Sequence, residues 1–267
     1  MSGDLNRQNP TAGETATDSD RVGIRAAARL FARSQTVTVP MVLLALIIPI
    51  YLFIGGGLLP GRTIYAPAIW LDEAIPVNAA WSVVYLSLFL AALLPVFVVH
   101  QQDLVRRTVN AFLAIWLVAY VFFIAFPTIG PRPSGKVLGD DFSDWLLQTI
   151  YSSDHRYNCF PSLHVAQCFL TAFICNLVHR GVGTVALLWA TMVGISTLYT
   201  KQHYALDAFS GVLLAYVAYR IFVRDYPRLN TPELERHLAP ILALGAVATY
   251  GLMVTIMWIA YRLGVVV

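Results

Sequence analysis

Residues 108–126 read TVNAFLAIWLVAYVFFIAF, a run of 19 residues without a charged side chain. An α-helix needs about 20 apolar residues to cross the hydrocarbon core of a bilayer. The whole chain has the same character, because 58% of its 267 residues are hydrophobic, only 12% are charged, and the mean hydropathy is +0.65. Soluble domains carry about 25% charged residues. The composition therefore excludes a soluble enzyme, a disordered chain and a nucleic-acid-binding domain.

Six further apolar stretches flank this run. They lie at 36–57, 78–99, 162–178, 183–200, 205–223 and 239–262. Because backbone groups in lipid must satisfy their own hydrogen bonds, the pattern predicts an all-α, polytopic transmembrane bundle. We expect a six-helix domain at 36–223 and one additional transmembrane helix at 239–262. The fourth to sixth stretches contain polar residues and are short, so a five-helix alternative stays open.

Two segments precede the predicted bundle. Residues 1–20 are polar and show no apolar period, which predicts a disordered tail. Residues 21–35 carry an arginine at every fourth position and are predicted to form a basic, amphipathic helix on an anionic membrane surface. These arginines are Arg21, Arg25, Arg29 and Arg33. An Arg-rich mitochondrial presequence is the alternative interpretation. The N-terminus has no signal-peptide pattern, so the first crossing is expected to remain as an anchor.

The distribution of basic residues predicts the orientation. With the N-terminus inside, twelve of the 18 lysines and arginines fall in inner segments. By the positive-inside rule, this bias predicts a cytoplasmic N-terminus and an outer C-terminus. It also places the loop 127–161 and the turn near 201–204 together on the outer side.

Three polar clusters stand at the helix ends that this topology places outside. They are Gly130-Pro131-Arg132-Pro133, Cys159-Phe160-Pro161-Ser162-Leu163-His164 and Lys201-Gln202-His203-Tyr204-Ala205-Leu206-Asp207. Ionisable residues at the boundary of a bilayer are costly, so they indicate a functional site.

His203 and Asp207 are four residues apart, which places them on one face of a helix. The carboxylate can then hold one imidazole nitrogen while the other points outward, as in histidines that act as bases or nucleophiles. A structural hydrogen bond explains such a pair equally well when it stands alone.

The other two clusters supply groups suited to an anion. Ser162 is a candidate N-cap, and a helix that begins there would present free N–H groups to a ligand. His164, in the first turn, is a candidate for proton transfer. Arg132 lies between two prolines and has the planar fork that binds phosphate. Alone, the serine would be read as a simple cap and the arginine as an interfacial anchor.

The order Arg-Pro, Pro-Ser-x-His and His-x3-Asp resembles the three signature motifs of the type-2 phosphatidic acid phosphatase superfamily, over roughly residues 36–223. The resemblance implies that His203 attacks phosphorus, that Asp207 orients it and that His164 protonates the leaving oxygen. It also implies that Arg132 and Ser162 bind phosphate oxygens, that membrane lipids are the substrates, and that no metal or cofactor takes part.

Three positions depart from the usual motifs. Ala125 stands where the first motif has a lysine, Thr197 stands where the third has an arginine, and Leu163 replaces a glycine. Lys201 is the only nearby replacement for the two missing cations, and we predict that it binds substrate. Fewer cations favour a phosphodiester over a doubly charged monoester.

In these departures the chain resembles the branch of inositolphosphorylceramide and sphingomyelin synthases. The sequence therefore predicts a lipid phosphotransferase that acts at the outer face of the membrane. A lipid phosphate phosphatase is the alternative within the same mechanism, and a non-catalytic lipid-binding or transport protein is the alternative of another class.

Overall fold

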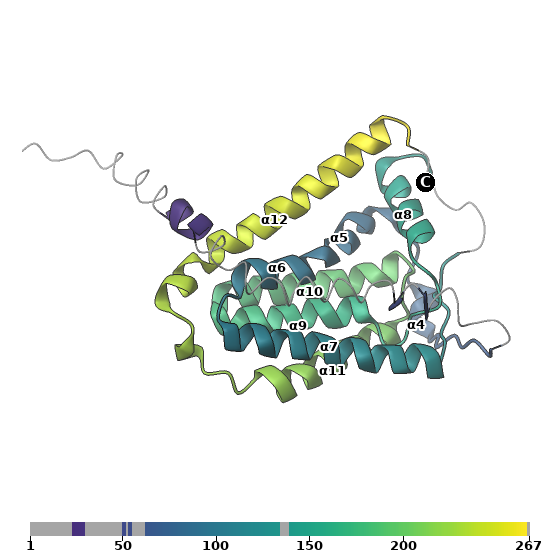
Figure 1. Ribbon diagram of the computed structural model, residues 1–267. Helices are drawn as coiled ribbons and strands as arrows, with labels where there is room; N and C mark the ends of the chain where they lie inside the picture. The colour runs from purple at the N-terminus through teal and green to yellow at the C-terminus, as the bar shows by residue number, and fades with distance from the viewer. Residues whose placement is uncertain (1–22, 30–49, 52, 55–61, 134–138, 266–267) are drawn as a thin grey trace, which may run out of the picture.

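The computed structural model describes residues 23–29, 50–51, 53–54, 62–133 and 139–265 (Figure 1). Within these residues the regular structure is helical, and extended pairing is limited to two isolated bridges. The helices are α4 (Trp70–Ala74), α5 (Ser82–Leu86), α6 (Leu90–Val98), α7 (Gln102–Ala125), α8 (Phe142–Ser153), α9 (Leu163–Val178), α10 (Arg180–Tyr199), α11 (Ala205–Ala218) and α12 (Glu233–Arg262). Shorter helical turns are η1 (Ala79–Trp81), η2 (Ser87–Phe89), η3 (Tyr219–Val223) and η4 (Arg228–Asn230). The predicted all-α fold is confirmed.

Five helical segments in the described part of the chain are long and apolar enough to cross a membrane. They are Ala79–Val98, which runs from η1 to α6, then α7, α10, Ala205–Val223, which joins α11 to η3, and α12. Each corresponds to a predicted apolar stretch. The predicted stretch at 162–178 corresponds to α9, which is shorter than a full crossing.

The N-terminal predictions fall mostly outside the described residues. Nothing is described for 1–20, and only 23–29 of the predicted interfacial segment 21–35 are described, as helix. Most of the predicted first crossing, 36–57, is likewise not described. The count of six core helices therefore stays a prediction.

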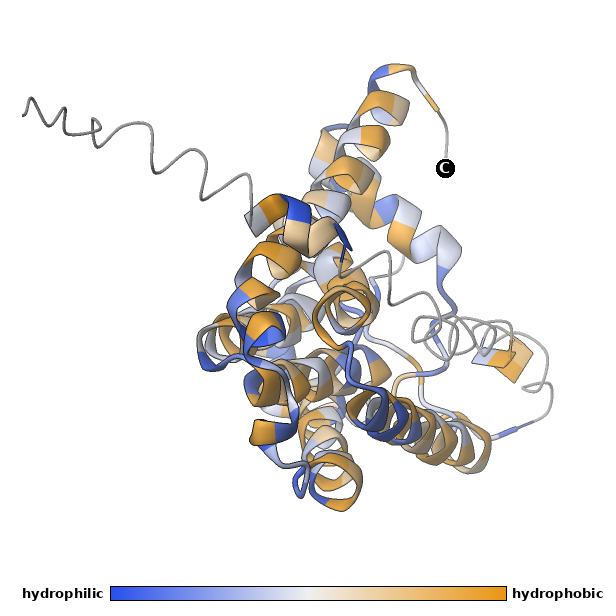
Figure 2. Cartoon of the chain, turned by 60° about the vertical axis from the view of Figure 1, so that its left-hand side comes forward, coloured by the Kyte–Doolittle hydropathy of each residue, from blue (hydrophilic) through white to orange (hydrophobic). Residues whose placement is uncertain are grey.

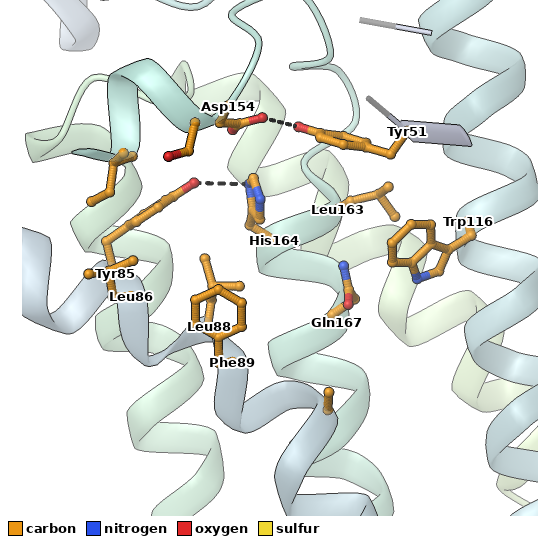
Figure 3. Close-up of a pocket in the computed structure, with 13 residues that line it drawn as sticks. Tyr51, Tyr85, Leu86, Leu88, Phe89, Trp116, Asp154, Leu163, His164 and Gln167 are labelled. Carbon is orange, nitrogen blue, oxygen red and sulfur yellow. Dashed lines mark hydrogen bonds between the residues drawn. The ribbon is translucent and has the colours of Figure 1, made fainter. Parts of the chain in front are cut away.

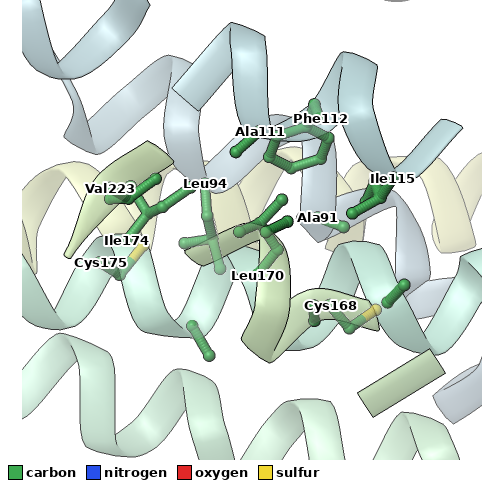
Figure 4. Packing of buried hydrophobic residues seen from close by; sticks show 14 of the residues in the cluster. Ala91, Leu94, Ala111, Phe112, Ile115, Cys168, Leu170, Ile174, Cys175 and Val223 are labelled. Atoms are coloured by element: carbon green, nitrogen blue, oxygen red, sulfur yellow. The ribbon is translucent and has the colours of Figure 1, made fainter. Parts of the chain in front are cut away.

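Helix α9 is the centre of the bundle and contacts α6, α7, α10 and α11. Its apolar side chains, among them Cys168, Leu170, Ile174 and Cys175, are fully buried and pack against residues of α6 and α7 (Figure 4). The Thr171 hydroxyl donates a hydrogen bond to the Ala91 carbonyl of α6 at 2.7 Å. Because protein surrounds this helix on all sides, it tolerates polar residues that a lipid-facing helix would not.

The long helices consist mostly of apolar residues (Figure 2), and many of these residues are exposed. Leu117 and Val121 on α7 and Leu188 on α10 are 67%, 58% and 66% exposed. Only 11% of the most apolar window of α12 is buried. Such contiguous apolar surface is unfavourable in water, which supports a multi-pass membrane protein.

Helix α8 lies within the segment 127–161 that the sequence indicated only as an outer loop (Figure 1). It has 12 residues, too few to cross a bilayer, and Asp141 caps its N-terminus by accepting a hydrogen bond from Asp144 N. Its apolar face, with Leu146, Leu147 and Ile150, packs on Tyr85 of α5. The helix therefore covers one side of the site described below.

Gly211 allows α11 to approach α9 closely. A Cβ at this position would lie 2.5 Å from the Ser162 carbonyl oxygen and 3.1 Å from Val165 Cβ. The contact sets the distance between the first turn of α9 and the first turns of α11.

We expect Gly211→Ala to destabilise the protein by about 1–3 kcal/mol, because the added methyl group overpacks a contact made partly of backbone. The measurement is the midpoint of thermal unfolding in detergent. Gly251→Ala on α12 is the matched control, since a Cβ there has nothing within 4 Å. Equal midpoints for the two variants would contradict the close-contact interpretation.

Candidate functional site

The turn between α10 and α11 places the third polar cluster. The amide of Gln202 donates to the Thr197 carbonyl and that of Lys201 to the Leu198 carbonyl, which is the Schellman pattern of a helix C-terminus. Lys201 takes the left-handed conformation that this pattern requires, with φ of 52°. Gln202 and His203 therefore follow α10 directly, and α11 begins two residues after His203.

His203 and His164 meet at this end of the bundle. His203 Nε2 lies 3.0 Å from His164 Nδ1, and the two ring centroids are 5.3 Å apart. The backbone supports the contact, because the amide of Ser162 donates to the Asp207 carbonyl at 3.0 Å. The structure thus brings together two histidines that are 39 residues apart in the chain.

Asp207 lies beside the other ring nitrogen of His203. A carboxylate oxygen only accepts hydrogen bonds, so Asp207 Oδ2, 3.6 Å from His203 Nδ1, favours the tautomer that carries its proton on Nδ1. In that tautomer Nε2 presents a lone pair to His164, and His164 Nδ1 would donate the hydrogen bond between the rings. The 3.6 Å distance is an ion-pair separation longer than a hydrogen bond, and Oδ2 accepts one from the Tyr204 amide at 2.9 Å.

Ser162 is the N-cap of α9, as predicted from the sequence. Its Oγ accepts a hydrogen bond from the Val165 amide at 3.3 Å, and the residue is fully buried. This contact accounts for the serine as a cap, and its predicted role as a phosphate ligand remains a prediction.

Arg132 reaches the same end of the bundle, and its guanidinium is held by protein oxygens. Nη1 donates to the carbonyls of Tyr151 and Asp154 at 3.1 and 2.8 Å. Nη2 donates to Gln202 Oε1 at 2.6 Å and lies 3.6 Å from Asp154 Oδ2. Arg132 therefore contacts Gln202, the residue that precedes His203 in the chain.

Extended segments hold Arg132 in this position. The Tyr65 amide donates to the Pro127 carbonyl, the Ile129 amide donates to the Tyr65 carbonyl, and the Gly130 amide donates to the Arg156 carbonyl. A Cβ on Gly130 would lie 3.0 Å from the Gln202 carbonyl oxygen. Glycine at this position therefore permits the approach of the Arg132 segment to the α10–α11 turn.

Lys201 is placed differently from the other predicted phosphate ligands. Its Nζ donates to the Asp72 carbonyl of α4 at 2.8 Å, while the Asp72 carboxylate accepts from the Ala205 amide. Burial lowers the pKa of Lys201, and the Asp72 charge acts in the opposite direction. In this structure the ammonium fastens the turn to α4, and its binding of substrate remains a prediction.

A cavity of about 280 Å³ adjoins His164 (Figure 3). Its polar rim consists of His164, Tyr51, Tyr85 and Asp154, and the Tyr51 hydroxyl donates to Asp154 Oδ1 at 3.0 Å. The Tyr85 hydroxyl lies 3.4 Å from His164 Nδ1. Apart from the polar Ser153 and Gln167, the rest of the lining is apolar: Leu86, Leu88, Phe89, Ala92, Trp116, Ile150 and Leu163. The cavity can therefore hold the apolar part of a ligand whose polar end meets His164.

Four neighbours of the two histidines and of Arg132 were not singled out from the sequence. Asp154, Tyr51 and Tyr85 lie outside the three clusters, and Gln202 lies within the third without a predicted role. Their position depends on contacts between segments far apart in the chain, such as Tyr51 with Asp154. For Gln202, direct adjacency to His203 was the available signal.

Cys159, His203 and Asp207 form a group whose possible ligand atoms lie within 4.8 Å of one another. Burial, followed by the charges of Asp207 and Asp154, raises the pKa of the Cys159 thiol well above its usual value. The Sγ atom faces the carbonyl oxygens of Arg156 and Gln202, which can only accept a proton. Cys159 is thus a thiol in this arrangement, and a metal ion would have to displace its proton in order to bind the thiolate.

The fold and the site together define a class of protein: a helical membrane bundle with two facing histidines and a buried carboxylate at one end. A family model described as "PAP2 superfamily" matches residues 63–221, more than half of the chain. The chain belongs to this superfamily. The match covers all three motifs that suggested the resemblance, and it does not distinguish the synthase branch from the others.

A curated relative extends the comparison. The chain is 29% identical over 133 residues to the "Bacitracin transport permease protein BcrC" of Bacillus licheniformis. The aligned part covers 48% of this chain and 62% of that protein. No solved structure shows a significant match.

Proposed function

We propose that the protein is an integral membrane enzyme that cleaves a lipid phosphoester through a phosphohistidine on His203. The contact between His203 Nε2 and His164 Nδ1 at 3.0 Å carries this proposal. It pairs a nucleophile, whose free nitrogen is selected by Asp207, with a proton donor on the same side. Membership of the PAP2 superfamily supports phosphatase-type chemistry.

In the first step the phosphorus of the donor enters between the two rings and replaces their mutual hydrogen bond. The Nε2 lone pair of His203 forms the P–N bond, and the P–O bond to the lipid alcohol breaks. His164 gives its Nδ1 proton to the departing oxygen. The positive charge that develops on the His203 ring is stabilised by Asp207.

In the second step an acceptor hydroxyl attacks the phosphohistidine. His164 removes the hydroxyl proton, the new P–O bond forms, and the P–N bond breaks. The cavity beside His164 suits the apolar body of a lipid alcohol, either leaving or accepting, because most of its lining side chains are apolar. This supports transfer to an alcohol over transfer to water.

A singly charged phosphodiester is the proposed donor. Of the two predicted phosphate-binding cations, Lys201 already donates to the Asp72 carbonyl, and Arg132 Nη2 already has Asp154 Oδ2 at 3.6 Å. The motif departures, which resemble those of the inositolphosphorylceramide and sphingomyelin synthases, agree with this charge. A phospho-head group would then move from one lipid to another.

We further propose that the site faces the outer side of the membrane. Several arginines gather at the opposite end of the bundle, where Arg107 contacts the Phe222 carbonyl and Arg228 contacts the Asn176 carbonyl. By the positive-inside rule that end is cytoplasmic, together with the N-terminus.

Purified protein incubated with radiolabelled diester and monoester phospholipids, each with and without an acceptor alcohol, tests this function. We expect faster turnover of the diester and a labelled product that requires the alcohol. Faster turnover of monoesters with water as the sole acceptor would overturn the transferase and favour a lipid phosphatase. A chelator has no effect in the proposed mechanism and is included in each reaction.

A transport protein is the competing function, because the name of the Bacillus licheniformis relative describes a transport permease. Such a protein could use the same groups to bind an anionic lipid without cleaving it. No labelled product would then appear with any donor, whereas binding of the donor would persist.

A further inference from the structure

Unpartnered buried polar atoms gather at one place in the described part of the chain. Eight buried side-chain nitrogen or oxygen atoms there have no hydrogen-bond partner, and four of them belong to Arg132, Gln202, His203 and Asp207. A buried polar atom without a partner is costly, so such a cluster indicates groups that a ligand completes. His203 and Asp207 are explained by the proposed chemistry, which leaves Arg132 Nε and Gln202 Nε2.

The orientation of the Gln202 amide follows from its neighbour. Oxygen and nitrogen of an amide are assigned from the hydrogen bonds they make. Arg132 has only donors, so the atom 2.6 Å from its Nη2 must be the Gln202 oxygen. The Gln202 NH₂ group is consequently the one without an acceptor, and the residue is only 3% exposed.

The turn that follows α10 fixes Gln202 against rearrangement. The backbone amide of Gln202 donates to the Thr197 carbonyl, and its backbone carbonyl oxygen lies 3.6 Å from Cys159 Sγ. The side chain therefore starts from a rigid backbone, one residue before the proposed nucleophile. A donor held in advance at this position costs little reorganisation when an anion binds.

We propose that the Gln202 side-chain amide donates a hydrogen bond to a phosphate oxygen of the substrate, beside the Nε–H of Arg132. This inference rests on the proposed function and adds a specificity residue to it. A neutral amide supplies a donor without a positive charge, where the usual motifs supply cations. The pair of Arg132 and Gln202 thereby matches the single charge of a phosphodiester.

The test compares Gln202→Glu with Gln202→Leu in the full-length protein. Glutamate keeps an oxygen for Arg132 but has no N–H donor and adds a negative charge beside the phosphate. Leucine loses the contact with Arg132 as well as the donor. If Gln202 binds phosphate, we expect kcat/KM for the diester to fall by about 100-fold or more in the glutamate variant, and by less in the leucine variant.

The reverse order overturns the proposal, because a residue that only holds Arg132 is better replaced by glutamate than by leucine. Inhibition by inorganic phosphate gives a second measurement, and we expect its inhibition constant to rise most in the glutamate variant. Gln102→Glu is the matched control, since this exposed residue begins α7 at the opposite end of the bundle. Thermal midpoints of all variants report on folding.

Gln202→Lys keeps the proposal testable if the glutamate variant does not fold. A cation at this position should shift the ratio of monoester to diester turnover by about tenfold toward the monoester, by charge matching. An unchanged ratio in a folded variant overturns the proposal. The His203→Ala variant distinguishes failure of the proposed function from failure of the Gln202 proposal. If His203→Ala keeps its turnover, the phosphohistidine mechanism is wrong. If His203→Ala loses turnover while the Gln202 variants keep normal turnover, only the proposed role of Gln202 is wrong.

Discussion

His203→Ala is expected to lower kcat by about 10⁴-fold or more, the scale seen when a nucleophile is removed from a catalytic triad. Alanine leaves no lone pair facing phosphorus, and the remaining groups bind the phosphate without forming a bond to it. Brief reaction of the wild type with a donor labelled in the phosphate should yield a protein-bound label that is stable in base and lost in acid. His203→Ala should yield none.

Two further variants sharpen this experiment. His237→Ala removes a histidine from α12 whose side chain is 76% exposed and pairs with Glu233, so it should leave turnover within about twofold. His164→Ala keeps the nucleophile and should accumulate less product because proton transfer is lost, by about 10²–10⁴-fold. Turnover by His203→Ala above a tenth of the wild-type rate would refute the phosphohistidine and leave a binding or transport role.

The long lipid-facing helices were predictable because their residues meet lipid directly. The uncharged run 108–126 of α7 indicates a membrane-spanning helix by itself. In α12 only 11% of the apolar window is buried. For α9 the sequence signal was weaker. Its 16 residues are shielded from lipid by four other helices. The bilayer therefore does not require this helix to be as long or as uniformly apolar as the others.

Helix α8 shows where the sequence was not enough. Its 12 residues are too short for a crossing, and its apolar face is complementary to Tyr85 rather than to lipid. Only the folded arrangement of α5 and α12 creates that partner. An outer loop and an outer helix look alike in hydropathy when the helix is this short.

The site residues likewise fall into those that local sequence placed correctly and those that depend on contacts between distant segments. His203 stands two residues before α11 rather than on the expected helix face, yet Asp207 lies in the first turn of α11 and the spacing of four residues still placed the two side chains close together. The N-cap role of Ser162 also follows from local sequence. Arg132, by contrast, was expected to face a phosphate, and its contacts with Gln202 and Asp154 span 70 and 22 residues. Such contacts are set by the packing of loops, which periodicity does not encode.

Asp207→Asn is expected to lower kcat by about 10³–10⁴-fold while KM changes little, as for the corresponding change in a serine triad. An asparagine oxygen can still accept from the Tyr204 amide in the place of Asp207 Oδ2, which is also the atom 3.6 Å from His203 Nδ1. The NH₂ group then takes the place of Oδ1, and no negative charge remains beside the His203 ring to stabilise the cation that forms during attack. The fold is kept, whereas the phosphohistidine intermediate loses its stabilising carboxylate.

Asp72→Asn separates this effect from a general loss of a buried carboxylate near the turn. The Asp72 carboxylate is also buried and accepts from the amides of Ile69 and Ala205, yet the histidines are not among its contacts. We expect it to lose at most about tenfold in kcat, since an amide oxygen replaces one acceptor. Rates of phosphohistidine formation, measured in a single turnover, should fall for Asp207→Asn and persist for Asp72→Asn. Equal losses in both would mean that Asp207 stabilises the turn and leaves the orientation of His203 to other groups.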